Sequence, residues 1–551
     1  MMKQLKGAPL IWKLVAFVGL PLAALFACGA ISALVYAILV PVQGVSREVA
    51  GPTMEPADAV VEGLDVSPTA ASSETDPEPP DPPAISGATP TATRVVLATP
   101  EMTDQLAGAE DSQSVAPTAT PPGEDITNPD YIEAKAAYKA KDYQEVLRLT
   151  TLVIEESPDL APAYWYRGMA YFYTDDYRAA LVDMERALAL DPDYALAYAD
   201  RGMLYAELGE ESRAFSDWEQ ALSLDPTLAK VHHNMGVLYY NGDDYLNAVK
   251  EYRLALSIDP GRAESWNNLG QIQQNMGQYE ACIESASNAL NLQPDIWESY
   301  YSRGSCKANL GDFKSAIEDF DILLDAEPDN AEGLYNRGLS YRYLGNDQQA
   351  LSDYSQAIAL NPFFVWAFIN RGNVYIDLEE YNLALADYNA ALDLGEIPLA
   401  YTGRGDAHSG LGDYETAIDD YMKAIDLLPG FADAHARLAI AYLNLNDYQE
   451  AIDTADRVLA LDPGGATEPL TLQTRGRAYY GLEDYQQAIE DFNRVMEINP
   501  TVMDFYYRGL AYEADGQAEQ AIQDYKMFLT QGGAGNQERI NDAQTRLSEL
   551  E

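Results

Sequence analysis

The chain has 551 residues and a formal net charge of −52, from 87 acidic and 35 basic residues. Because binding to phosphate needs clustered lysine and arginine, this balance argues against nucleic acid as a partner. Three cysteines are too few for a disulfide framework, and the four histidines are too few and too poorly placed for a catalytic or metal centre.

The first predicted element is a transmembrane helix over residues 14–40, which follows a basic N-terminus at 1–13. Its 27 residues carry no charge. As a helix it would extend about 40 Å, enough to cross the roughly 30 Å hydrocarbon core of a bilayer with some tilt. Three lysines precede it (Lys3, Lys6 and Lys13), which predicts a cytoplasmic N-terminus and an extracytoplasmic location for everything after the helix.

Two alternatives to this membrane anchor stay open. A cleaved secretory signal has a shorter apolar core than this run. The segment ending at Cys28 loosely resembles a bacterial lipoprotein cleavage site, but Phe26 fits that site poorly and twelve more apolar residues follow the cysteine. An uncleaved anchor is therefore the reading we favour.

Residues 41–127 are predicted to form a disordered tether. The segment is rich in proline, threonine, alanine and acidic residues, as in the run 76–83. Such a composition cannot bury enough apolar surface to offset the entropy of the chain. Its mean reach is at least roughly 50 Å.

A repeat dominates the rest of the chain. Ten glycines occur in one sequence context, and the first seven are 34 residues apart: Gly168, Gly202, Gly236, Gly270, Gly304, Gly338, Gly372, Gly405, Gly476 and Gly509. Each unit contains two segments of helical periodicity, joined by a short turn, and most units end in a proline such as Pro192. A period of this length with two helices per unit is typical of a helical solenoid.

This frame resembles the tetratricopeptide repeat. The resemblance implies an all-α fold: a right-handed solenoid of about twelve helix pairs over residues 128–535, closed by a capping helix over 536–551. Two junctions depart from the frame. One residue is lost at Gly395–Glu396, and the three residues 466–468 are inserted before the eleventh unit.

An arginine precedes the glycine in eight units, and an aspartate stands sixteen residues later in the same eight. We predict an ion pair between the two helices of each such unit, the alternative being two independent preferences of this repeat subtype. The pairs are Arg167/Asp183, Arg201/Asp217, Arg303/Asp319, Arg337/Asp353, Arg371/Asp387, Arg404/Asp420, Arg475/Asp491 and Arg508/Asp524.

The resemblance also implies a concave groove lined by the second, fifth, ninth, twelfth and thirteenth residues of each unit. These positions hold eight acidic and five basic residues, so the groove is nearly neutral within a very acidic array. Units 1 and 2 supply an aromatic set suited to apolar anchors, and units 4 to 6 supply amides suited to a peptide backbone. The candidates are Tyr131, Tyr138, Trp165, Met169, Phe172 and Tyr173, then Asn241, Asn267, Gln271, Gln274, Asn275 and Asn309.

Asparagines two residues before a repeat glycine, such as Asn336 and Asn370, resemble the asparagine ladder in the arrays of glycosyltransferases that modify protein hydroxyls. Cys282 and Cys306 replace packing residues of the repeat. We interpret them as small buried hydrophobic residues, with a bridge between them as the open alternative.

These features predict a scaffold and not an enzyme, with no cofactor and no metal. The expected protein is anchored in a bacterial cytoplasmic membrane and recruits proteins or peptides in its groove on the extracytoplasmic side. Two alternatives use other surfaces: a structural spacer or self-assembling envelope element, and an accessory subunit of a glycosyl-transfer or secretion machine.

Overall fold

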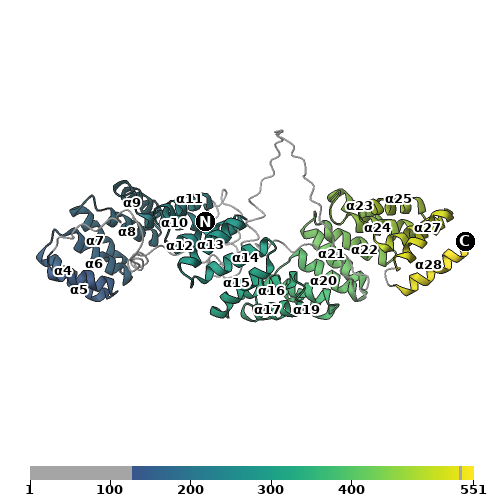
Figure 1. Ribbon diagram of the computed structural model, residues 1–551, viewed down its shortest axis with the longest axis horizontal. Helices are drawn as coiled ribbons and strands as arrows, with labels where there is room; N and C mark the ends of the chain where they lie inside the picture. The colour runs from purple at the N-terminus through teal and green to yellow at the C-terminus, as the bar shows by residue number, and fades with distance from the viewer. Residues whose placement is uncertain (1–126, 533–535) are drawn as a thin grey trace, which may run out of the picture. The chain divides into compact units, whose positions relative to one another are not determined.

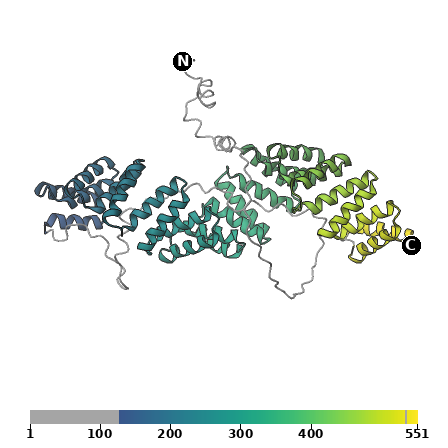
Figure 2. The ribbon, with the colours of Figure 1, turned by 90° about the horizontal axis from the view of Figure 1, so that it is seen from above.

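The computed structural model describes residues 127–532 and 536–551. Within these ranges every regular element is an α-helix, and each helix packs against the next one along the chain (Figures 1 and 2). The predicted transmembrane helix at 14–40 and nearly all of the predicted tether lie outside them. No helix in the described ranges combines the length and the apolar composition that crossing a bilayer requires.

The helices form twelve consecutive pairs, here called units 1 to 12, followed by one more helix. The first helices are α4 (Pro129–Lys139), α6 (Ala161–Tyr173), α8 (Ala195–Glu207), α10 (Ala229–Asn241), α12 (Ala263–Asn275), α14 (Trp297–Asn309), α16 (Ala331–Tyr343), α18 (Val365–Asp377), α20 (Pro398–Gly410), α22 (Ala432–Asn444), α24 (Glu468–Gly481) and α26 (Val502–Ala514). The second helices are α5 (Tyr143–Glu156), α7 (Tyr177–Leu190), α9 (Glu211–Leu224), α11 (Tyr245–Ile258), α13 (Tyr279–Leu292), α15 (Phe313–Ala326), α17 (Asp347–Leu360), α19 (Tyr381–Leu394), α21 (Tyr414–Leu427), α23 (Tyr448–Leu461), α25 (Tyr485–Ile498) and α27 (Ala518–Thr530). The last helix is α28 (Gln537–Leu550).

The turn inside each unit has one fixed conformation. Its second residue has a positive φ in all twelve units, and in six of them that residue is a glycine, such as Gly311 at φ 81°. Glycine adopts this left-handed region without a steric penalty, which is why it ends helices so often. In several units an aspartate follows and caps the second helix. Asp312, for example, accepts a hydrogen bond from the backbone N–H of Ser315 at 3.2 Å.

The repeated glycine makes room mainly for a ring. A Cβ at Gly202 would lie 2.5 Å from the indole nitrogen of Trp218, and one at Gly338 would lie 3.0 Å from the ring of Tyr354. In both cases the ring comes from the second helix of the same unit. The second helices also approach closely through an alanine that is fully buried in ten units, from Ala180 to Ala521. The core therefore runs between the paired helices and on into the next unit.

The predicted capping helix is present as α28, which packs against α27. Its Ala543 is fully buried, and Ile540 and Leu547 pack against the cluster of buried residues that includes Tyr525 and Phe528 of the last unit. Both irregular junctions are loops between units. One separates α19 from α20, which begins at Pro398, and the other separates α23 from α24, which begins at Glu468.

Candidate functional site

All eight predicted arginine–aspartate pairs are present, and each is bidentate. The arginine Nε and Nη2 donate to the two carboxylate oxygens of the aspartate sixteen residues later, at 2.6–3.0 Å. The hydrogen bond to Asp353 raises the pKa of Arg337 despite the opposing effect of burial. The planar fork of arginine suits this geometry.

The aspartates of these pairs are core residues and not part of a surface that a ligand could reach. Each carboxylate lies between the two helices of its unit, where the arginine occupies both of its oxygens. These aspartates therefore have a structural role only. Their ion pairs differ from surface ion pairs because the carboxylates are shielded from water. All eight are between 2% and 7% exposed: Asp183, Asp217, Asp319, Asp353, Asp387, Asp420, Asp491 and Asp524.

The third nitrogen of the same arginines joins neighbouring units, which the sequence analysis missed. In seven of the eight, Nη1 donates to a side chain on the second helix of the preceding unit. The acceptors are Thr151, Ser287, Asp321, Ser355, Asn389, Asp456 and Asn493. All seven occupy the same position of the repeat. The recurrence of a polar residue at that position, in the unit before each arginine, is the sequence signal that could have predicted these bonds. Unit 10 has Leu438 in place of the arginine, and the acceptor position in the preceding unit is occupied by Met422.

The aromatic set of units 1 and 2 is not an open surface, so that prediction is wrong. Tyr131, Trp165, Met169 and Phe172 are 1%, 6%, 0% and 8% exposed. Half-buried Tyr138 and Tyr173 pack against Tyr143. The physical reason is that rings from adjacent units cover one another. The ring centroid of Trp165 lies 6.1 Å from that of Tyr138 of unit 1 and 6.1 Å from that of Tyr194, the residue directly before α8 of unit 3.

Trp165 also takes part in a buried polar network across units 2 to 4. Its indole N–H donates to Asp200 Oδ2 at 2.9 Å, and Lys230 Nζ lies 2.9 Å from Asp200 Oδ1. Both carboxylate oxygens of Asp200 thus have a partner inside the protein. The Trp165 side chain is therefore part of the core and not of a binding surface.

The asparagine ladder is a second correction, because these amides bind the protein itself. Asn370 Nδ2 donates to the hydroxyl of Tyr335 at 2.9 Å, and Asn336 Nδ2 donates to that of Tyr301 at 3.1 Å. Both asparagines are buried, at 4% and 1% exposure. They join successive first helices instead of presenting amides to a ligand.

The amides of units 4 to 6 are more accessible. Asn241 and Asn275 are exposed, and Gln271 and Gln274 are half-buried. The side chains of Asn241, Gln271 and Gln274 form no hydrogen bond with any residue in the described part of the chain. The other candidates are engaged: Asn275 with Tyr240, Asn267 Oδ1 with Ser299 Oγ at 2.7 Å, and Asn309 Nδ2 with the carbonyl of Ser305 at 2.9 Å. We call the set Asn241, Gln271, Gln274 and Asn275 the amide face.

Charged residues of the first helices neutralise one another further along the array. Arg437 contacts Asp406 Oδ2 at 2.7 Å and Asp433 Oδ2 at 2.8 Å, and Tyr421 donates to Asp406 Oδ1 at 2.7 Å. Burial raises the pKa of Asp406 to about 6, against the opposing effect of Arg437. In the same way Arg342 pairs with Asp377 at 3.0 Å. At these two places arginines of the first helices thus pair with acidic residues of the first helices.

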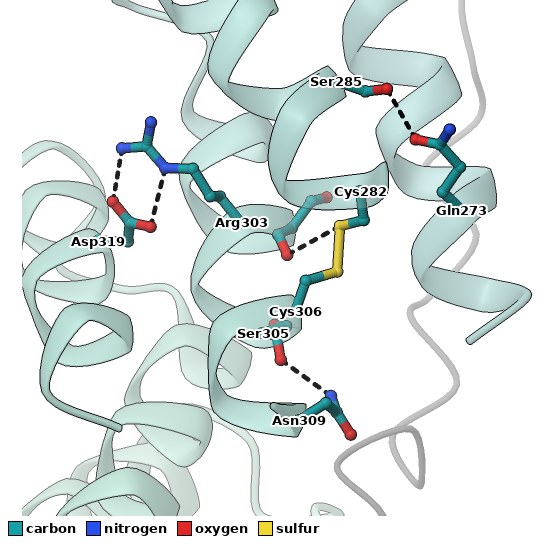
Figure 3. The surroundings of a disulfide bond; sticks show 9 residues. Gln273, Cys282, Ser285, Arg303, Ser305, Cys306, Asn309 and Asp319 are labelled. Atoms are coloured by element: carbon teal, nitrogen blue, oxygen red, sulfur yellow. Dashed lines mark hydrogen bonds and ion pairs between the residues drawn. A yellow bond between two sulfur atoms is a disulfide. The ribbon is translucent and has the colours of Figure 1, made fainter. Parts of the chain in front are cut away.

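Cys282 and Cys306 form a disulfide, so the interpretation as two free cysteines is wrong and the alternative is correct. Cys282 belongs to α13 and Cys306 to α14, and both are fully buried. Figure 3 shows the bond between helices of adjacent units, close to Ser305 and Asn309. Each cysteine stands at a position that is alanine in several other units, and these two positions meet across the boundary between units 5 and 6.

The tetratricopeptide repeat family matches ten segments of the chain, at residues 161–194, 195–228, 229–262, 251–284, 298–330, 331–364, 369–430, 402–466, 438–506 and 505–531. The chain belongs to the tetratricopeptide repeat family. The predicted family and its all-α helix pairs are therefore confirmed.

Several solved structures are similar to this chain. The APC/C hetero-tetramer Cut9–Hcn1 is 16% identical with a TM-score of 0.43, over 76% of this chain and 95% of that chain. Yeast Tom70 is 16% identical with a TM-score of 0.34, over 71% and 96%. A tetratricopeptide repeat protein from Parabacteroides merdae is 20% identical with a TM-score of 0.38, over 45% and 98%. Among curated proteins, none matches the sequence significantly.

Proposed function

We propose that the protein is a non-catalytic, membrane-tethered scaffold whose tetratricopeptide array binds an extended polypeptide segment along the amide face of units 4 and 5. One observation carries this proposal. Asn241, Gln271 and Gln274 belong to first helices, are at least partly exposed, and form no side-chain hydrogen bond within the described ranges. Elsewhere the asparagines and aromatic residues of the first helices that were predicted to bind a partner are buried or paired.

The chemistry of these side chains indicates the kind of ligand. A glutamine or asparagine amide both donates and accepts hydrogen bonds, so a row of them can pair with successive N–H and C=O groups of a peptide backbone. The amide face carries no charge, so the proposed recognition depends on backbone hydrogen bonds rather than on charged side chains of the partner. The right-handed superhelix that the family implies would line these amides along a concave groove.

The tether and its orientation come from the sequence. The uncharged segment 14–40 with lysines before it supports a proposed location of the array on the extracytoplasmic side of a bacterial cytoplasmic membrane. The disulfide supports this location, because disulfides persist in oxidising compartments and are rare in the cytosol. Protease added to intact spheroplasts should therefore degrade the array; protection from it would contradict the outward orientation.

Site-specific photo-crosslinking in cells tests the binding face. A photoreactive residue at Gln271 or Gln274 should crosslink to a polypeptide, whereas one at Gln348 or Gln349, amides of the second helix α17, should not. The Gln271→Ala/Gln274→Ala variant should bind the same partner more weakly, with Gln348→Ala/Gln349→Ala as the matched control. Equal crosslinking from both helices would favour the spacer or envelope-element alternative.

A further inference from the structure

Helices α12, α13 and α14, which carry or adjoin the amide face, are tied to one another pairwise. Each tie joins a different pair of the three helices, and together they close a triangle. Ser285 Oγ donates to Gln273 Oε1 at 2.7 Å between α13 and α12, Ser299 Oγ donates to Asn267 Oδ1 at 2.7 Å between α14 and α12, and the Cys282–Cys306 disulfide joins α13 to α14. Figure 3 shows the disulfide and the Ser285–Gln273 bond.

The triangle lies at the end of two successive units that lack the arginine joint. Units 4 and 5 have Met235 and Leu269 at the arginine position, so neither makes the bidentate pair or the bond to the preceding unit. At the next boundary Arg303 reaches Ser287 Oγ at 3.3 Å, a neutral acceptor, whereas Arg337 reaches the carboxylate of Asp321 at 2.7 Å. The disulfide stands at the boundary between units 5 and 6, directly after two of the four units that lack the arginine.

We propose that the Cys282–Cys306 disulfide is a clamp that holds α12, which carries Gln271, Gln274 and Asn275, in one position against α13 and α14 for binding the peptide. The peptide part of this inference rests on the proposed function. Cys306 directly follows Ser305 and lies one turn before Asn309 on α14, while α13 packs along α12, which carries Gln271 and Gln274. A covalent bond between α13 and α14 therefore sets the position of the amide-bearing helix relative to its neighbour.

Hydrogen-bond geometry explains why a fixed spacing matters. An N–H···O bond weakens steeply when its angle falls below about 120°, so amides that bind one extended backbone must stay in register. Holding them in register before the peptide arrives removes part of the ordering cost of binding. At the boundary between units 5 and 6 the disulfide acts in addition to the bond from Arg303 to Ser287.

The chemistry of the clamp is a single oxidation. The thiols of Cys282 and Cys306 lose two protons and two electrons to a donor disulfide, which leaves as two thiols, and one S–S bond forms. Both sulfur-bearing side chains are fully buried, so the bond is shielded from reductants once the array has folded. The clamp is thus a permanent feature of an array that folds in an oxidising compartment.

The first test measures the clamp without any ligand. Full-length protein is compared in three forms: oxidised, refolded in a phosphine reductant, and Cys282→Ala/Cys306→Ala. Alanine fits both positions because Ala248 and Ala316, and Ala170 and Ala407, occupy them in other units. Hydrogen exchange in α12, α13 and α14 should be slower in the oxidised form and equal in the other two, with units 8 to 12 unchanged. Equal exchange in all three forms would overturn the clamp.

The second test adds binding. The probe is a fluorescent peptide selected from a random-sequence library on the oxidised full chain, and its affinity should fall about tenfold for the reduced and the double-alanine forms, as a loss of pre-organisation predicts. Unchanged affinity together with altered exchange would overturn the link between clamp and binding. A peptide insensitive to Gln271→Ala/Gln274→Ala would count against the proposed function, while the exchange result would still decide the clamp.

Discussion

At the scale of single residues, the arginine at the seventh position of a unit performs two tasks with one guanidinium. In unit 7 its Nε and Nη2 hold Asp353 of the same unit, and its Nη1 holds Asp321 of the preceding unit. Asp353 is buried, whereas the side chain of Asp321 is 50% exposed. The two contacts should therefore differ in their energetic weight, because an unpaired charge is costly only where water cannot reach it.

We predict that Arg337→Met lowers the local free energy of unfolding by about 3 kcal/mol, because it leaves the buried Asp353 carboxylate unpaired. The double variant Arg337→Met/Asp353→Leu should lose less than the single one. Asp321→Ala should lose under about 1 kcal/mol, as an exposed pair does. Native-state hydrogen exchange of α16 and α17 measures all three. If the single and double variants opened with equal free energies, the pair would have no role as a unit.

Asp406 supplies a prediction of pH dependence. Its pKa of about 6 lies above the value of 3.8 for an unperturbed aspartate, so the folded state binds this proton more tightly than the unfolded state. The contribution of this group to stability is then fully present below pH 3.8 and is lost as the pH rises through 6. The stability of the wild type relative to Asp406→Asn should accordingly fall between about pH 4 and pH 6. A difference that stays flat across this window would contradict the burial effect.

At the scale of helices, the aspartate that starts a second helix should stabilise it measurably. Asp312 caps α15 by accepting from the N–H of Ser315, whereas Asn346 at the same position before α17 makes no such bond. We expect Asp312→Ala to cost about 1 kcal/mol in the opening of α15. Asn346→Ala, the matched control, should cost distinctly less. Hydrogen exchange in the first turn of each helix is the measurement, and equal effects would mean that the side-chain bond adds nothing.

The helices themselves could be predicted from the sequence, because period, turn and closing proline are local signals that recur along the array. The burial of individual side chains could not be predicted from the sequence. Trp165 stands at a position that was predicted to line the concave groove. However, the ring of Tyr194 packs against it, and Asp200 accepts a hydrogen bond from its indole N–H. The ion pairs were accessible to prediction because arginine and aspartate vary together at one spacing. The disulfide could not be predicted in the same way, since sequence spacing does not say whether two Cβ atoms point at each other across a unit boundary.

At the scale of the whole molecule, each helix packs against helices of its own unit and of the neighbouring units. Stability in such an array is a sum of contributions from units and from nearest-neighbour interfaces, so a perturbation should fade within a few units. The last unit packs against α28: Ile540 and Leu547 contact the buried cluster that includes Tyr525 and Phe528, and Asp542 accepts a hydrogen bond from Tyr506 at 2.8 Å. Removing α28 uncovers these rings.

We therefore predict that deleting residues 536–551 raises hydrogen exchange in α26 and α27, while α4 to α21 keep their protection, because no described contact of α28 reaches them. Ala543→Arg, which places a charge in the fully buried interface, should reproduce the effect in the intact chain. Gln544→Ala on the exposed side of α28 is the control and should change nothing. Loss of protection in units 1 to 9 would instead mean that the array unfolds as one cooperative body.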